Sequence, residues 1–130
     1  MVIDSSALLA LLLAEPEAER IAGAIAGDPR RLVCAFSALE TAILIEAKKG
    51  ELAGRELDLL LHRTRADVVV MESAQVEIAR SAWRRFGKGR HPAGLTIGDC
   101  CSYALSRFSG EPLLFKGEDI RKTDIAPVVC

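Results

Sequence analysis

Two kinds of apolar run alternate along the chain. Short continuous runs are typical of buried strands, and longer runs with apolar residues every three or four positions are typical of helices packed on one face. The predicted strands are residues 1–3, 31–35, 68–71, 112–115 and 125–129. The predicted helices are residues 7–14, 16–27, 37–49, 51–64, 73–86 and a late helix that begins after Thr96.

Because strands alternate with helices throughout, the pattern predicts an α/β three-layer sandwich around a mostly parallel central sheet. Residues 68–71 are continuously apolar, which is typical of a parallel strand covered on both faces. The last run contains Pro127, which an edge strand tolerates. The 130 residues suffice for one core and not for two, so we expect a single domain over residues 1–130.

Polar residues mark where several helices begin. Ser37 and Glu40 have the spacing of a capping box, in which two side chains satisfy each other's backbone N–H groups. Thr96 and Asp99 have a related spacing, with Asp in place of Glu. Ser73 is a candidate cap for the helix that follows it.

Charge and cysteine content exclude several classes of protein. Lys and Arg number 17 against 18 Asp and Glu, so the chain has no global attraction for nucleic acid or an anionic membrane, and either would need a local patch. No apolar run approaches the ~20 residues of a membrane span, and no cationic segment resembles a secretion signal. The four cysteines lack the spacing of a disulfide framework or a zinc site. We therefore expect a cytoplasmic protein with reduced thiols and no membrane contact.

Four acidic residues occupy comparable places in the predicted elements. Asp4 ends the first strand, Glu40 and Asp99 lie in the first turns of helices, and Asp119 follows the strand over residues 112–115. In an open parallel sheet, the carboxyl ends of strands and the N-termini of the following helices share one edge. The four carboxylates can therefore converge, although each of them could instead act alone as a helix cap or a turn residue.

Converging carboxylates would repel one another unless a cation binds them. Oxygen ligands without His or Cys suit Mg²⁺, and Mn²⁺ as a substitute. Such a cation holds a phosphodiester oxygen, activates a bound water and stabilises the leaving oxygen. This is the chemistry of a metal-dependent nuclease.

Four stretches of the sequence resemble a known family. They are M-V-I-D-S-S-A, S-A-L-E, G-K-G-R-H-P-A-G-L-T-I-G-D-C-C-S-Y-A-L-S and L-L-F-K-G-E-D-I-R-K-T-D-I. Together they resemble a PIN domain, and more narrowly the VapC-type toxins of bacterial toxin–antitoxin pairs. The resemblance implies a Mg²⁺-dependent endoribonuclease that an antitoxin holds inactive and that forms a homodimer.

The resemblance also assigns the metal-binding and catalytic residues. It places the family's acidic quartet on Asp4, Glu40, Asp99 and Asp119, with RNA as the substrate. Glu118 and Asp124 lie beside Asp119 in the sequence, so either could share the metal or replace it.

The only basic cluster precedes the late helix. Lys88 and Arg90 suit either RNA phosphates or the end of the preceding helix, whose dipole Arg84 and Arg85 would complement. We expect Trp83 and its neighbour Phe86 to lie in the core or an interface rather than to stack on bases. The apolar helices over residues 7–25 and 42–61 carry more Leu, Ile and Ala than a small sheet needs. This excess predicts a dimer or antitoxin groove, or else an ordinary core.

Other functions fit the sequence less well. A phospho-acceptor receiver domain needs a second acid after the first strand, where Asp4 is followed by two serines. A non-catalytic PIN-like module that binds a protein partner is the main alternative to a ribonuclease. The presence of all four acids weighs against it.

Overall fold

A computed structural model describes all residues, 1–130. The strands are β1 (Val2–Ile3), β2 (Leu32–Cys34), β3 (Asp67–Val69) and β4 (Leu113–Leu114). The helices are α1 (Ser5–Leu12), α2 (Ala18–Ala26), α3 (Ala35–Lys49), α4 (Ala53–Arg63), α5 (Ser73–Phe86) and α6 (Ile97–Ser109), with a 3₁₀ turn at Ile120–Lys122. No helix combines the length and the apolar character that crossing a membrane requires.

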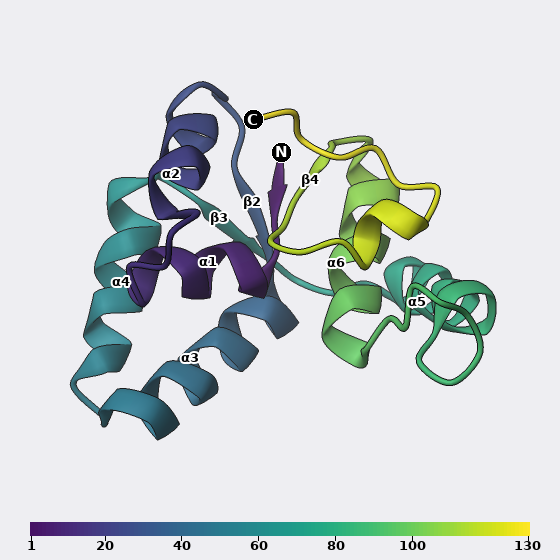
Figure 1. Cartoon of the computed structure of the whole chain (residues 1–130), viewed down its shortest axis with the longest axis horizontal. Helices are drawn as coiled ribbons and strands as arrows, with labels where there is room; N and C mark the ends of the chain where they lie inside the picture. Colours follow the sequence, from purple (N-terminus) through teal and green to yellow (C-terminus); the bar gives the residue numbers. More distant parts are fainter.

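The strands form one parallel sheet in the order β3-β2-β1-β4. Helices α1, α2, α3 and α4 lie on one side of it, and α5 and α6 lie on the other (Figure 1). This arrangement confirms the predicted α/β three-layer architecture. The parallel pairing follows from the helical crossovers, each of which returns the chain to the same end of the sheet.

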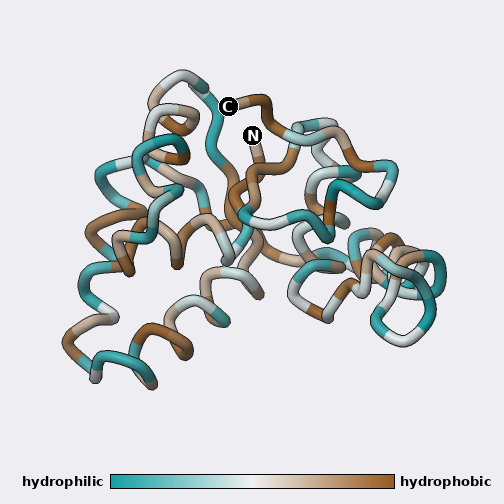
Figure 2. The backbone as a smooth tube through the Cα atoms, viewed as in Figure 1, coloured by the Kyte–Doolittle hydropathy of each residue, from teal (hydrophilic) through white to brown (hydrophobic).

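The alternation of side chains along the strands divides the core in two. Val2 and Leu113 belong to the cluster beneath α5 and α6, whereas Ile3 and Leu114 belong to the cluster beneath α1 and α2. Figure 2 shows the hydrophobic colour concentrated along the central strands, with hydrophilic segments mostly on the outer helices and loops. Strands buried on both faces explain why these short runs are continuously apolar.

Two predicted strands differ from the structure. The apolar run at residues 68–71 contributes only its start to β3, and Val68 and Val70 are exposed rather than covered on both faces. The reason is position, because β3 forms the edge of the sheet. The predicted strand over residues 125–129 is reduced to a single bridge between Pro127 and Leu113, since proline lacks the N–H that a continued ladder needs.

Two predicted helix starts also differ. Helix α5 is capped by Glu72, in a reciprocal box with Gln75, and not by Ser73. Helix α3 begins at Ala35, directly after β2, so Ser37 lies inside the first turn and caps nothing. The predicted capping box of Ser37 and Glu40 is therefore wrong, which leaves both side chains free for tertiary contacts.

Candidate active site

The carboxyl ends of the central strands bring the predicted acids to one edge of the sheet. Asp4 directly follows β1, which lies between β2 and β4. Glu40 lies one turn into α3, which continues from β2, and Asp119 lies in the segment after β4. Asp99 is in the first turn of α6, which packs against β1 and β2. The parallel topology thus places all four acids at the same end of the sheet.

Asp4 is fully buried and its carboxylate is surrounded by hydroxyl groups. The Ser102 hydroxyl donates to Oδ1 at 2.5 Å, and the Ser6 hydroxyl and backbone N–H donate to Oδ2 at 2.6 and 3.0 Å. Ser37 lies 3.1 Å from Ser102 Oγ, which extends the network to α3. Burial raises the pKa of the Asp4 carboxyl, and the charge of Glu40 raises it further, against the lowering effect of these hydrogen bonds.

The Glu40 side chain points from α3 towards α6. Its Oε1 atom is buried and has no hydrogen-bond partner in the structure. It lies over Gly98, where a Cβ atom would come within 2.5 Å of Oε1. A buried carboxylate oxygen without a donor is costly, so this atom is a natural ligand for a cation.

Asp99 forms the predicted capping box with Thr96. Its Oδ2 accepts from the Thr96 N–H at 3.0 Å, and its own N–H lies 3.4 Å from Thr96 Oγ1. Partial burial raises the pKa of Asp99, and the charges of Asp4 and Asp119 add to the rise, whereas the Thr96 hydrogen bonds lower it. The charges of two other members of the quartet therefore act on Asp99.

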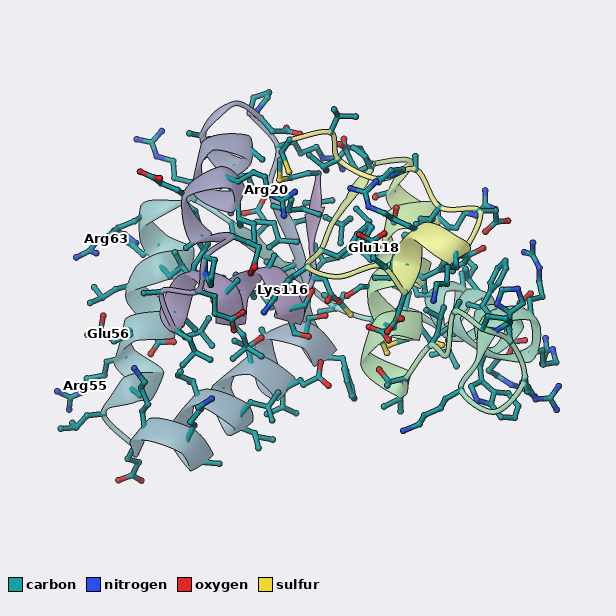
Figure 3. All side chains as sticks on the ribbon, viewed as in Figure 1. Arg20, Arg55, Glu56, Arg63, Lys116 and Glu118 are labelled. Carbon is teal, nitrogen blue, oxygen red and sulfur yellow. The ribbon has the colours of Figure 1, made fainter.

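The segment after β4 places its three acids differently. Asp119 is exposed, and its charge contributes to the raised pKa of Asp99. Glu118 (labelled in Figure 3) is also exposed, and its Oε2 lies 3.8 Å from Nε of Arg121. The neighbouring Lys116 forms ion pairs with Glu15 and Glu17.

Asp124 is engaged elsewhere. Its oxygens accept from Tyr103 at 2.6 Å, Arg107 at 2.6 Å and Arg85 at 2.9 Å. Although partial burial opposes the effect, these hydrogen bonds and the two positive charges lower the pKa of Asp124. This cluster ties the C-terminal segment to α5 and α6, so Asp124 acts as an anchor and is not free to replace Asp119.

The composition of the site fits a hard divalent cation. Burial raises the pKa of the nearby thiols, to about 11 for Cys100 and about 12 for Cys101, so both are protonated and unsuited to bind a metal. Only carboxylate and hydroxyl oxygens remain as donors, which Mg²⁺ prefers. No three acidic, cysteine or histidine side chains are already gathered as a preformed metal site.

Sequence reasoning missed three residues that shape the site. Ser37 and Ser102 form a buried hydroxyl pair behind Asp4, and Gly98 makes room for the Glu40 carboxylate. A signal was present in the spacing, because Ser37 precedes Glu40 by three residues and Ser102 follows Asp99 by three. Residues three apart share a helix face, so each hydroxyl lies on the same side as an acid.

Comparison with known proteins finds similar sequences and folds over nearly the whole chain. The family model of the PIN domain matches residues 1–126. A ribonuclease VapC of Mycolicibacterium smegmatis is 58% identical over 98% of this chain and 99% of its own length. Ribonuclease VapC30 of Mycobacterium tuberculosis is 57% identical over 98% of each chain.

Two solved structures share the fold. The crystal structure of Mycobacterium tuberculosis VapC20, described as a toxin that cleaves the sarcin–ricin loop, superposes with a TM-score of 0.79 at 17% identity, over 98% of this chain and 97% of that one. A toxin–antitoxin complex from Klebsiella pneumoniae contains a chain that superposes with a TM-score of 0.70 at 14% identity, over 95% of this chain and 92% of that one.

Proposed function

Since the chain belongs to the PIN domain family, and within it to the VapC ribonuclease toxins of toxin–antitoxin systems, we propose that it hydrolyses RNA at a Mg²⁺ site made by its acidic edge. The ligands proposed are Asp4, Glu40, Asp99 and Asp119. The observation that carries this assignment is the buried, unpartnered Glu40 Oε1 beside the buried Asp4 carboxylate. Two carboxylates held together in a poorly solvated place are costly without a cation between them.

Bound Mg²⁺ supplies an activated water and a positive charge for the phosphodiester oxygens, and Mn²⁺ is the expected substitute. The chain's own residues fix where that happens. Ser6 and Ser102 hold both oxygens of Asp4 and so determine the orientation of its carboxylate. The first turns of α3 and α6 point backbone N–H groups towards the same edge, which favours the approach of a phosphate.

An antitoxin protein is the proposed regulatory partner. Of the two expected apolar stretches, residues 42–61 expose Ile43, Leu44 and Leu59, whereas no large apolar side chain of residues 7–25 is exposed. Leu39, one turn before Ile43 on α3, adds to the exposed face. A cavity of about 380 Å³ opens between α1 and α3, lined by Leu9, Leu13 and Leu44 among others. We propose that an apolar antitoxin segment lies along this face and reaches the acidic edge. A second copy of the chain is the other proposed partner, which sedimentation of the purified chain would detect.

The test of the metal site uses Asp99→Asn. Because Asn can still accept a hydrogen bond at one oxygen, the variant keeps the cap and loses at most the charge–dipole interaction of ~0.3–1 kcal/mol. We expect it to fold normally, to lose most of its stabilisation by Mg²⁺ and to lose cleavage of RNA. The wild type should leave 5′-phosphate and 3′-hydroxyl ends on the cleaved RNA, and its cleavage should stop in excess EDTA.

Three outcomes would reject the proposal. Cleavage by Asp99→Asn at the wild-type rate would remove this residue from the site. A 2′,3′-cyclic phosphate product would show that the ribose hydroxyl and not water attacks, and undiminished cleavage in EDTA would show that no bound metal ion is needed. A folded wild-type chain with neither a Mg²⁺ response nor cleavage would favour the non-catalytic binding module.

A further inference from the structure

A cationic groove adjoins the acidic edge. It has a volume of about 770 Å³ and lies between α5, the start of α6 and the loop that joins them. Its apolar floor includes Phe36, Met71 and Val76. We call it the α5–α6 groove. An open apolar groove of this size on a small protein indicates a binding surface.

The charge of the α5–α6 groove is of one sign. Arg80, Arg84, Lys88 and Arg90 line it and no acidic residue does. Of these cations, only Arg80 forms an ion pair with an acidic side chain, Glu77. An apolar protein segment or a second copy of the chain would have to desolvate the other three without neutralising them, which is unfavourable. A polyanion would neutralise the same three cations, so the groove favours a polyanion as its ligand.

Trp83 lies in the α5–α6 groove and not in the core, which was one of its two expected places. Phe86, on the same helix, is buried as expected, but 45% of the Trp83 surface is exposed. The guanidinium of Arg90 lies 4.4 Å from the centre of the Trp83 ring. The Cδ1–Nε1 edge of the ring lies beside Gly87, where an added Cβ would come within 2.5 Å of Cδ1. The indole and the guanidinium thus form a stacked, half-exposed pair, and planar groups of both kinds stack on nucleobases in RNA-binding proteins.

The α5–α6 groove reaches the acidic edge at two points. Thr96 lines the groove and holds Asp99 through the capping box. Phe36 lines it one helical turn before Glu40. A strand of nucleic acid in the groove would thus continue into the acids without a break.

We propose that the α5–α6 groove binds the single-stranded RNA next to the phosphate that is cut, with a base stacked on the Trp83–Arg90 pair and phosphates paired with Arg84 and Lys88. The inference rests on the proposed ribonuclease function, whose substrate it places. Cations at the groove also offset the repulsion between RNA and the acidic edge.

The test uses Trp83 as its own probe, because it is the only tryptophan in the chain. Binding is measured in EDTA with the Asp99→Asn variant as the background, so that no RNA is cut. The probes are a single-stranded oligouridylate of about 8 nucleotides, within the usual range of such sites, and an abasic oligomer of equal length. The Trp83 fluorescence reports binding directly, and fluorescence anisotropy of end-labelled RNA reports it for variants that lack Trp83.

Two variants separate stacking from charge. Trp83→Ala should weaken binding of the oligouridylate about 5- to 100-fold and have little effect on the abasic oligomer. Lys88→Ala should weaken both probes and lower the slope of log affinity against log salt by about 0.7. Arg55→Ala is the matched control, because Arg55 points outward from α4, on the far side of the molecule from α5 (Figures 1 and 3). It should change neither affinity nor slope by a comparable amount.

Several results would overturn the inference. If RNA binds without changing the Trp83 fluorescence, the RNA lies elsewhere. The same holds if Lys88→Ala and Arg55→Ala change the affinity for RNA equally. A Trp83 spectrum that shifts with protein concentration in the absence of RNA would assign the groove to a second copy of the chain. If the groove binds RNA in these assays but the wild type does not cleave with Mg²⁺, the proposed function fails, whereas the assignment of the groove as an RNA-binding surface stands.

Discussion

Gly98→Ala is the substitution that tests most directly how the site is assembled. Gly98 lies in the first turn of α6, directly beneath the Glu40 carboxylate. An added methyl group would lie 2.5 Å from Oε1 and 2.8 Å from Oε2, whereas ordinary contacts begin near 3.4 Å. The atoms in the way are the far end of a flexible side chain, so Glu40 rather than the backbone must move, by roughly 1 Å.

The expected effects on stability and activity are opposite. Alanine favours a helix over glycine by roughly 0.5–1 kcal/mol, so the free energy of unfolding should stay level or rise slightly. A displacement of about 1 Å at a reacting centre can cost on the order of 10²-fold in rate, and we expect a loss of this size in RNA cleavage. Stabilisation by Mg²⁺ should fall as well, since it follows from the affinity of the folded state for the ion.

The matched control is Gly23→Ala. Gly23 is also inside a helix, α2, and an added Cβ there meets nothing within 4 Å. It should raise stability by a similar amount and leave cleavage unchanged. The measurements are chemical unfolding with and without Mg²⁺ and the rate of RNA cleavage. Gly98→Ala protein that folds and cleaves like the Gly23→Ala control would show that the position of Glu40 does not matter.

Two further predictions concern the buried Asp4. Asp4→Asn should fold with near-wild-type stability but without a Mg²⁺ response, because its amide can donate to Ser102 while its oxygen accepts from Ser6. Asp4→Ala should lower the free energy of unfolding by roughly 2–4 kcal/mol, because the cap is lost and its hydrogen-bond donors are left without an acceptor. Chemical unfolding of both variants would measure the difference. Since folding raises the Asp4 pKa above 3.8, the folded state holds the proton longer, and the free energy of unfolding should fall, relative to Asp4→Asn, as pH rises above 3.8. Millimolar Mg²⁺ should reduce this fall, because the ion competes with the proton; a difference that rises with pH would contradict the assignment.

The sequence predicted those features that depend on local pattern. The central strands were found because both of their faces are buried, which gives short apolar runs. The Thr96–Asp99 box was found because a cap involves residues three apart. The parallel topology then follows from the helical crossovers, and it alone places Asp4 between the elements that carry Glu40 and Asp119.

The features that were missed depend on contacts between distant elements. Nothing in the run at residues 68–71 shows that β3 is an edge strand, because strand order is a property of the whole sheet. The contact of Glu40 with Gly98 joins α3 to α6, and the Ser102 bond to Asp4 joins α6 to the end of β1. The interpretation of Ser37 and Glu40 as a capping box failed for the same reason, since the tertiary contact with Ser102 directs Ser37 inward.

The sequence presented helix capping and metal binding as alternatives for these acids, and the structure shows that they are compatible. Asp99 uses only Oδ2 to accept from Thr96, so the cap fixes the side chain and leaves Oδ1 for a ligand. Asp4 caps α1 through Ser6 while its carboxylate stays buried beside Glu40. A cap costs a carboxylate little and gives it a defined orientation, which is what a metal ligand needs. Stability alone therefore cannot separate the two roles, and the decisive measurement for any of these acids is the change in its Mg²⁺ response.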